Sequence, residues 1–188
     1  SNTIGRNCWV KTSRKYFTDY KITANDGDTL YDYDINLEDQ RVYIALDSKS
    51  LGDTLAWFPY VEEFRKKYKC QVICSTFWNN FFKDIYPEIE FIKPGEVANN
   101  IRAMYTVGWF YFEDGNIDYS KNPVDFKLQP LQKTAADILG LEYKEIKPNI
   151  KLSNNIEKEN IISIAIHGTS QAKYWNNSEG WQQLVDYL

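Results

Sequence analysis

An apolar run at residues 42–47, followed by a polar loop and then by an amphipathic stretch, constrains the fold of this chain most. The run is almost continuously β-branched, aromatic or aliphatic, which predicts a buried strand. The loop at residues 48–52 contains a glycine, and Asp53 opens a helix that we expect to continue to Tyr68. In open α/β sheets, ligands bind at the carboxyl ends of the strands, where helix starts present free N–H groups. The sequence therefore places Asp53 where ligands usually bind.

The same alternation of strand and helix continues along the chain and predicts a parallel sheet. We expect strands at residues 71–74, 89–92 and 103–107, a short aromatic helix at residues 77–85, and a helix at residues 130–139. Pro130 is expected at the first position of that last helix and Gly140 at its end. Pro59 leaves the start of the first helix open, because it either kinks the helix or begins its regular part. The expected fold is α/β, with a Rossmann-like parallel sheet at residues 41–150.

Both ends of the chain differ from this central part. Residues 1–40 contain short, roughly alternating aromatic stretches with a tight turn at residues 25–28, which predicts a small antiparallel β hairpin region. Residues 161–166 read as another buried strand, and Ser178 as the cap of a final helix. One strand and one helix cannot cover a sheet of their own, so we expect residues 151–188 to be the start of a second α/β domain that is truncated in this chain.

The charge and the cysteines exclude several classes of function. A net charge of −4 and a pI near 5.1 offer no attraction for nucleic acid. No apolar run reaches the roughly 20 residues that span a bilayer, and no signal peptide is recognisable, so a cytoplasmic protein is expected. Cys8, Cys70 and Cys74 lack the spacing of metal ligands, and we interpret them as buried thiols.

Two loops carry a resemblance to a known family. Ser48-Lys-Ser-Leu-Gly-Asp53, with Leu55 and Pro59 after it, and the distant His167-Gly-Thr-Ser-Gln-Ala-Lys-Tyr-Trp175 resemble the ADP-heptose glycosyltransferases. Residues 51–67 and 75–79 are most similar to the bacterial autotransporter heptosyltransferases, which modify serine hydroxyls of adhesins. The resemblance covers about the whole chain but only the N-terminal half of the family's architecture. It implies the GT-B arrangement, in which two Rossmann-like domains face each other across a cleft.

The resemblance also implies roles for individual residues. Asp53 corresponds to the general base, and Lys173 to the lysine that neutralises the donor phosphates, with Thr169 and Ser170 as the small hydroxyl residues beside them. The acceptor side would include Lys49, Ser50, Gly52, Trp78 and Asn79. The chemistry agrees, because an alcohol nucleophile benefits from a carboxylate within hydrogen-bond reach and a departing diphosphate benefits from a nearby cation.

Each of these roles has a structural alternative. Asp53 could serve only as a helix N-cap, and Lys49 and Lys173 could be solvated surface charges. Core packing is the alternative for Trp78 and Trp109. His167 is interpreted as a packed residue at a strand end and is given no role in the chemistry.

The resulting hypothesis is a glycosyltransferase, or its N-terminal half, that transfers heptose from ADP-heptose to serine hydroxyls of an autotransporter adhesin. The alternatives are a non-catalytic binding or assembly module and another nucleotide-sugar-dependent glycosyltransferase. An unrelated Rossmann nucleotide binder is disfavoured, because no Gly-x-Gly-x-x-Gly pattern follows a predicted strand. The subgroup carries a cysteine-ligated iron in its later half, so no metal is expected in this chain, and ADP-heptose is a substrate. The expected partners are the nucleotide-sugar donor and the acceptor adhesin, and the resemblance to the subgroup implies that the chain could form a homo-oligomer.

Overall fold

A computed structural model of the 188-residue chain describes residues 3–25, 30–151, 160–168 and 170–188. The chain divides into two compact units, Ser1–Leu152 and Ser153–Leu188. Each unit is described by itself below.

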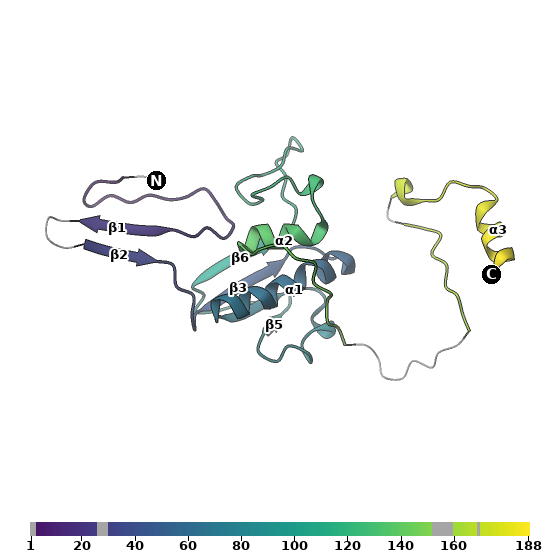
Figure 1. Ribbon diagram of the computed structural model, residues 1–188, viewed down its shortest axis with the longest axis horizontal. Helices are drawn as coiled ribbons and strands as arrows, with labels where there is room; N and C mark the ends of the chain where they lie inside the picture. Colours follow the sequence, from purple (N-terminus) through teal and green to yellow (C-terminus); the bar gives the residue numbers. More distant parts are fainter. Residues whose placement is uncertain (1–2, 26–29, 152–159, 169) are drawn as a thin grey trace. The chain divides into compact units, whose positions relative to one another are not determined.

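The first unit is built on a four-stranded parallel sheet (Figure 1). Its strands are β3 (Arg41–Leu46), β4 (Gln71–Ser75), β5 (Glu90–Ile92) and β6 (Ala103–Val107), in the order β5-β4-β3-β6. In the register of the central strands, Ile44 of β3 lies opposite Cys74 of β4 and Tyr105 of β6. The predicted α/β fold with a parallel sheet is confirmed, because all three strand pairs run parallel.

Helix α1 (Leu51–Tyr68) follows β3 and contains Pro59 in its interior, which settles the open helix start. Proline cannot donate a hydrogen bond to the carbonyl of the residue four positions earlier, which normally weakens a helix. Here Phe58 and Tyr60, on either side of the proline, are completely buried. Their packing keeps the helix continuous through Pro59.

Helix α2 (Leu131–Leu139) packs against α1 and β6. Pro130 is the residue just before the helix, one position earlier than expected, and Gly140 ends the helix with a positive φ of 64°. A side chain at position 140 would also meet the ring of Phe17, because a Cβ there would lie 2.9 Å from Cγ of Phe17. The glycine therefore allows both the left-handed backbone and the close approach of this ring.

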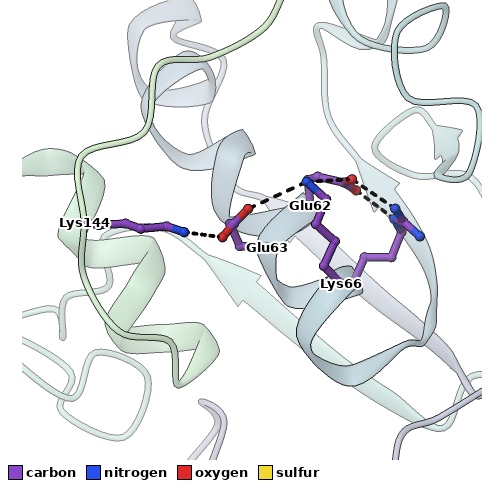
Figure 2. A network of polar contacts seen from close by, with 5 residues as sticks. Glu62, Glu63, Lys66 and Lys144 are labelled. Carbon is purple, nitrogen blue, oxygen red and sulfur yellow. Dashed lines mark hydrogen bonds and ion pairs between the residues drawn. The ribbon is translucent and has the colours of Figure 1, made fainter.

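The segment after α2 is held against α1 by paired polar contacts. The Tyr60 hydroxyl donates to the backbone oxygen of Lys144 at 2.6 Å and accepts from its backbone nitrogen at 2.9 Å. The ammonium group of Lys144 contacts Glu63 at 2.7 Å, and Figure 2 shows the Glu63 carboxylate between Lys144 and Lys66. Because Tyr60 lies in the core, these contacts hold the segment around Lys144 against α1.

The N-terminal region forms the expected antiparallel hairpin from β1 (Lys21–Asn25) and β2 (Leu30–Asp34). The predicted turn at residues 25–28 lies mostly outside the described residues. Phe17 joins the hairpin region to the main core: it donates its backbone N–H to Ile138 and packs beside Phe64 with ring centroids 5.9 Å apart.

Three local predictions were wrong. Residues 77–85 form a single 3-10 turn, Asn79–Phe81, because bulky aromatic residues are anchored in the core: Phe82 is fully buried and stacks on Phe58 at 3.9 Å. Residues 161–166 form no strand, since a strand needs a partner and the described residues of the second unit provide none. At the start of helix α3 (Gly180–Tyr187), the side chain of Asn177, and not that of Ser178, accepts from the backbone N–H groups of Glu179 and Gly180.

The three cysteines differ in exposure, which yields a first prediction. Cys8 is exposed, so its interpretation as a buried thiol was wrong, whereas Cys70 and Cys74 are buried. Burial raises the pKa of Cys70 to about 11 and also raises the pKa of Cys74, so both remain thiols near neutral pH. We expect a thiol-reactive dye to label Cys8 rapidly in the native chain, and Cys70 and Cys74 only after denaturation. Peptide mapping that finds equal native labelling at all three positions would contradict this packing.

Candidate functional site

Most of the predicted acceptor-side residues lie on loops that leave the carboxyl ends of neighbouring strands, and Gly52 lies in the first turn of α1. Residues 47–50 follow β3, residues 76–79 follow β4, and residues 108–110 follow β6. The first two loops contact each other directly: the indole N–H of Trp78 donates to the backbone oxygen of Lys49 at 3.1 Å, and the Lys49 ammonium lies 5.7 Å from the centroid of the Phe77 ring. The structure thus brings Lys49 and Trp78 together at this edge of the sheet.

Asp53 lies in the first turn of α1, where a chain of short contacts orients its carboxylate. The Ser48 hydroxyl donates to Oδ2 of Asp53 at 2.6 Å and accepts from the backbone N–H of Ser50 at 3.0 Å. The N-cap of the helix is Ser50, whose hydroxyl accepts from the backbone N–H of Asp53 at 3.5 Å. Capping is therefore the task of Ser50, and the carboxylate of Asp53 is held by Ser48 instead.

This arrangement leaves Asp53 able to act on a ligand. The residue is half-buried, and its Oδ1 atom accepts no hydrogen bond from the part of the chain that the structure describes. A carboxylate that is fixed through one oxygen and open at the other can accept a proton from a nearby hydroxyl.

Gly52, next to Asp53, would let a ligand come close to the backbone at the start of α1. A Cβ on Gly52 would lie 3.7 Å from the Ser50 hydroxyl, which is an ordinary contact, so packing within the chain does not require glycine here. Glycine inside a helix costs roughly 0.5–1 kcal/mol relative to alanine. An exposed glycine beside Asp53 is therefore consistent with a ligand that passes close to the backbone.

Trp78 and Asn79 occupy the loop after β4. Trp78 is half-buried and packs beside Phe81 with ring centroids 5.8 Å apart. The Oδ1 atom of Asn79 is buried and has no hydrogen-bond partner among the described residues. Trp109, after β6, remains partly exposed while its ring lies edge-on to Trp57 at 5.9 Å and stacks on Phe126 at 5.9 Å.

Two supporting residues were missed in the sequence. Ser48 was recognised only as part of a motif, although it orients Asp53. Asn122 fixes the loop after β6, since its amide donates to the backbone oxygen of Gly108 at 2.9 Å and accepts from the backbone N–H of Phe110 at 2.9 Å. Ser48 could have been found from its spacing to the helix cap, whereas nothing local marks Asn122.

The predicted phosphate-binding residues belong to the second unit. Lys173 ends a 3-10 turn, Gln171–Lys173, and its backbone N–H donates to the Ser170 carbonyl at 3.0 Å. Both side chains are exposed, and Thr169 lies outside the described residues. Gly168 packs closely on the same turn, because a Cβ there would lie 3.2 Å from Cβ of Lys173. Since Asp53 belongs to the first unit, its pairing with this loop across a cleft stays a prediction.

The described ranges contain neither a cluster of metal-ligating side chains nor a helix that could span a membrane. Within them, no three His, Cys, Asp or Glu side chains form a group suited to hold a metal ion. None of the helices described there combines the length and the apolar character needed to cross a bilayer.

The curated proteins that the chain resembles are all autotransporter heptosyltransferases. No protein-family model matches the chain. The chain is 35% identical to the autotransporter heptosyltransferase Aah of Escherichia coli, over 96% of the chain and 47% of that protein. It is 34% identical to TibC of E. coli O78:H11 and to BAHTCr of Citrobacter rodentium, over 45% of each. The chain thus spans about half the length of the curated relatives it matches.

Solved structures agree with the sequence relatives. The crystal structure of TibC, an iron-containing dodecameric glycosyltransferase, aligns with a TM-score of 0.77 at 32% identity and covers 96% of this chain and 48% of TibC. TibC in complex with ADP-D-β-D-heptose aligns with a TM-score of 0.81. These comparisons confirm the resemblance to the autotransporter heptosyltransferases, including its restriction to about half of their length.

Proposed function

We propose that this chain, which resembles the autotransporter heptosyltransferases over nearly its whole length, is the acceptor-side half of such an enzyme. The complete enzyme would transfer heptose from ADP-heptose to serine hydroxyls of an autotransporter adhesin. The observation that carries the proposal is the Asp53 carboxylate, fixed at 2.6 Å by Ser48 at the carboxyl end of β3. The relatives that align with 96% or more of this chain are heptosyltransferases, and TibC binds ADP-heptose in one crystal structure.

In the proposed reaction, Asp53 accepts the proton of the acceptor serine while the serine oxygen forms a bond to the anomeric carbon. The bond between that carbon and the diphosphate oxygen breaks, and ADP leaves with the electron pair. Lys173, with the hydroxyls of Ser170 and Thr169, would stabilise the charge on the departing diphosphate. Lys49, Ser50, Gly52, Trp78 and Asn79 would border the acceptor.

The finer biological setting is part of the same proposal. We place the enzyme in the cytoplasm and expect it to associate with copies of itself, as the dodecameric TibC does. TibC also contains iron. Of the cysteines here, Cys70 and Cys74 are buried and Cys8 is exposed, and none belongs to a cluster of possible metal ligands among the described residues, so we assign no iron ligand to these residues.

The function can be tested with the full-length transferase, ADP-heptose and an adhesin passenger domain. We expect ADP release together with heptose on serine-containing peptides, detected by mass spectrometry. ADP-glucose serves as the control donor. Transfer from ADP-glucose alone would indicate another nucleotide-sugar-dependent glycosyltransferase, and absence of transfer from both donors would favour a binding module.

Replacing Ser48 by alanine should slow this reaction without unfolding the protein. The variant loses a hydrogen bond to a charged group, and the carboxylate of Asp53 becomes free to rotate, so we expect kcat to fall roughly 10-fold. Ser48→Thr keeps a hydroxyl and should recover most of the rate. Steady-state kinetics with a melting curve for each variant would check this; a loss of melting temperature in Ser48→Ala that Ser48→Thr shares, with no change in kcat, would show a purely structural role.

A further inference from the structure

A cavity lies at the free edge of the sheet, beside β6. It is a cavity of about 410 Å³, which is within the size range of ligand sites. The walls of the cavity come from the N-terminal segment, from β6 and from the residues that follow β6. They are Arg14, Lys15, Tyr16, Met104, Tyr105, Thr106, Phe110 and Lys121. None of these residues has been given a role in the transfer reaction.

The charge of this cavity is opposite to that of the chain. Three cations line it and no carboxylate does, although the chain carries a net charge of −4. Some cations elsewhere in the unit are paired with carboxylates, as Lys66 and Lys144 are around Glu63 (Figure 2). In the described ranges, Arg14 and Lys15 form no ion pair, whereas Lys121 contacts Asp118 at 3.5 Å. Arg14 and Lys15 therefore leave positive charge available to a ligand.

The remaining walls are apolar and aromatic. Met104 is 67% exposed although it lies in a strand, and the Lys121 ammonium lies 4.9 Å from the centroid of the Phe110 ring. Tyr105 is largely buried, and burial raises the pKa of its phenol to about 12, so it contributes no charge to this wall. A ligand that fits would carry negative charge together with an apolar portion.

The cavity lies next to the loop that leads to Asp53. Thr106 is opposite Ala45 in the register of β6 and β3, and the backbone N–H of Asp47 donates to the Val107 carbonyl at 2.8 Å. Gly108 fits between the two features: a Cβ there would lie 3.1 Å from Cβ of Asp47 and 3.1 Å from Cζ of Phe110. One layer of residues separates the Phe110 wall from the start of the loop of residues 47–50.

We propose that this cavity binds an acidic segment of the acceptor polypeptide, close to the serine that is modified. The inference rests on the proposed function, because it needs a protein acceptor. A phosphate site usually uses a helix N-terminus or a glycine-rich turn, and no lining residue belongs to either. Long, exposed cationic side chains at the edge of a sheet suit carboxylates on an extended chain, whose backbone can also approach an edge strand.

The test measures binding by the 188-residue chain itself, without donor. A fluorescently labelled peptide that contains serine, two aspartates and a leucine is titrated with the chain, and anisotropy is recorded at low and high salt. We expect saturable binding that weakens with salt, and about 10-fold weaker binding of the matched peptide with asparagines. The double variant Arg14→Gln, Lys15→Gln should lose affinity for the acidic peptide by a similar factor, whereas Lys147→Gln, which does not line the cavity, should bind as the original chain does.

Two results would overturn the inference: equal affinity for the acidic and asparagine peptides, or a double variant that binds the acidic peptide normally. Displacement of the acidic peptide by ADP or inorganic phosphate, at concentrations only a few times the dissociation constant of the peptide, would also overturn the inference, because it would show a site for small anions. Heptose transfer is measured separately. Transfer without peptide binding here would refute only this inference, whereas peptide binding without transfer would refute the proposed function and, with it, the identification of the bound segment as an acceptor.

Discussion

Replacing Asp53 by asparagine in the full-length transferase should lower kcat by about 100- to 10,000-fold, the usual contribution of a general base. Asparagine has nearly the same shape and can still accept the hydrogen bond from Ser48, which spans 2.6 Å in the native chain. It cannot accept the proton of the acceptor serine. The loss should therefore appear in kcat, while KM for ADP-heptose changes little.

A structural explanation for such a loss can be tested separately. Asp53 lies at the start of α1, where a negative charge contributes about 0.3–1 kcal/mol to stability, so the melting temperature should fall only slightly. Asp47→Asn is the matched control, because Asp47 is an exposed carboxylate at the beginning of the same loop. We expect this control to stay within about twofold of the native rate, since it is not positioned by Ser48. Unchanged turnover in Asp53→Asn would exclude Asp53 as the base.

Replacing Phe58 by alanine should destabilise the chain by about 3–5 kcal/mol, the largest effect on stability that we expect. Phe58 is completely buried on α1. Its ring stacks on Phe82 at 3.9 Å, and it packs edge-on against Tyr86 at 4.9 Å and beside Phe91 at 5.8 Å. Truncation removes the ring contacts of Phe58 with the segment after β4 and with the edge strand β5, and it leaves a cavity that these rigid rings cannot easily fill.

Urea denaturation followed by circular dichroism would measure this change. Phe112→Ala is the control, since Phe112 is 55% exposed, and its effect should stay within about 0.5 kcal/mol. A midpoint for Phe58→Ala close to that of the native chain would mean that the aromatic cluster around Phe58 is not packed as described.

The central fold could be predicted because its signals are local. The apolar run of β3 and the proline and glycine that bound α2 each specify an element from its own residues. Residues 77–85 were misjudged because tertiary contacts decide their form: the stacking of Phe82 on Phe58 overrides any helical periodicity. Residues 161–166 have the composition of a strand, but a strand also requires a neighbour, which no property of those six residues supplies.

The candidate site could be predicted only in part for a similar reason. Lys49 was assigned correctly to the loop after a strand, and Asp53 to the first turn of a helix, since a short segment contains the whole pattern. The contact of Trp78 with Lys49 spans 29 residues, and the amide of Asn122 fixes Gly108 from 14 residues away. The basic cavity combines residues 14–16 with β6, about 90 positions later, and no sequence spacing indicates such a junction.

The Ser48 hydroxyl has a consequence beyond orienting one side chain, because the same oxygen accepts from the backbone of Ser50 while it donates to Asp53. Fraying of the first turn of α1 would move Ser50 and release the carboxylate in one event. The reactive geometry then exists only in molecules whose helix is wound to its first residue, so the free energy of opening a single helical turn sets the fraction of molecules that are competent to react.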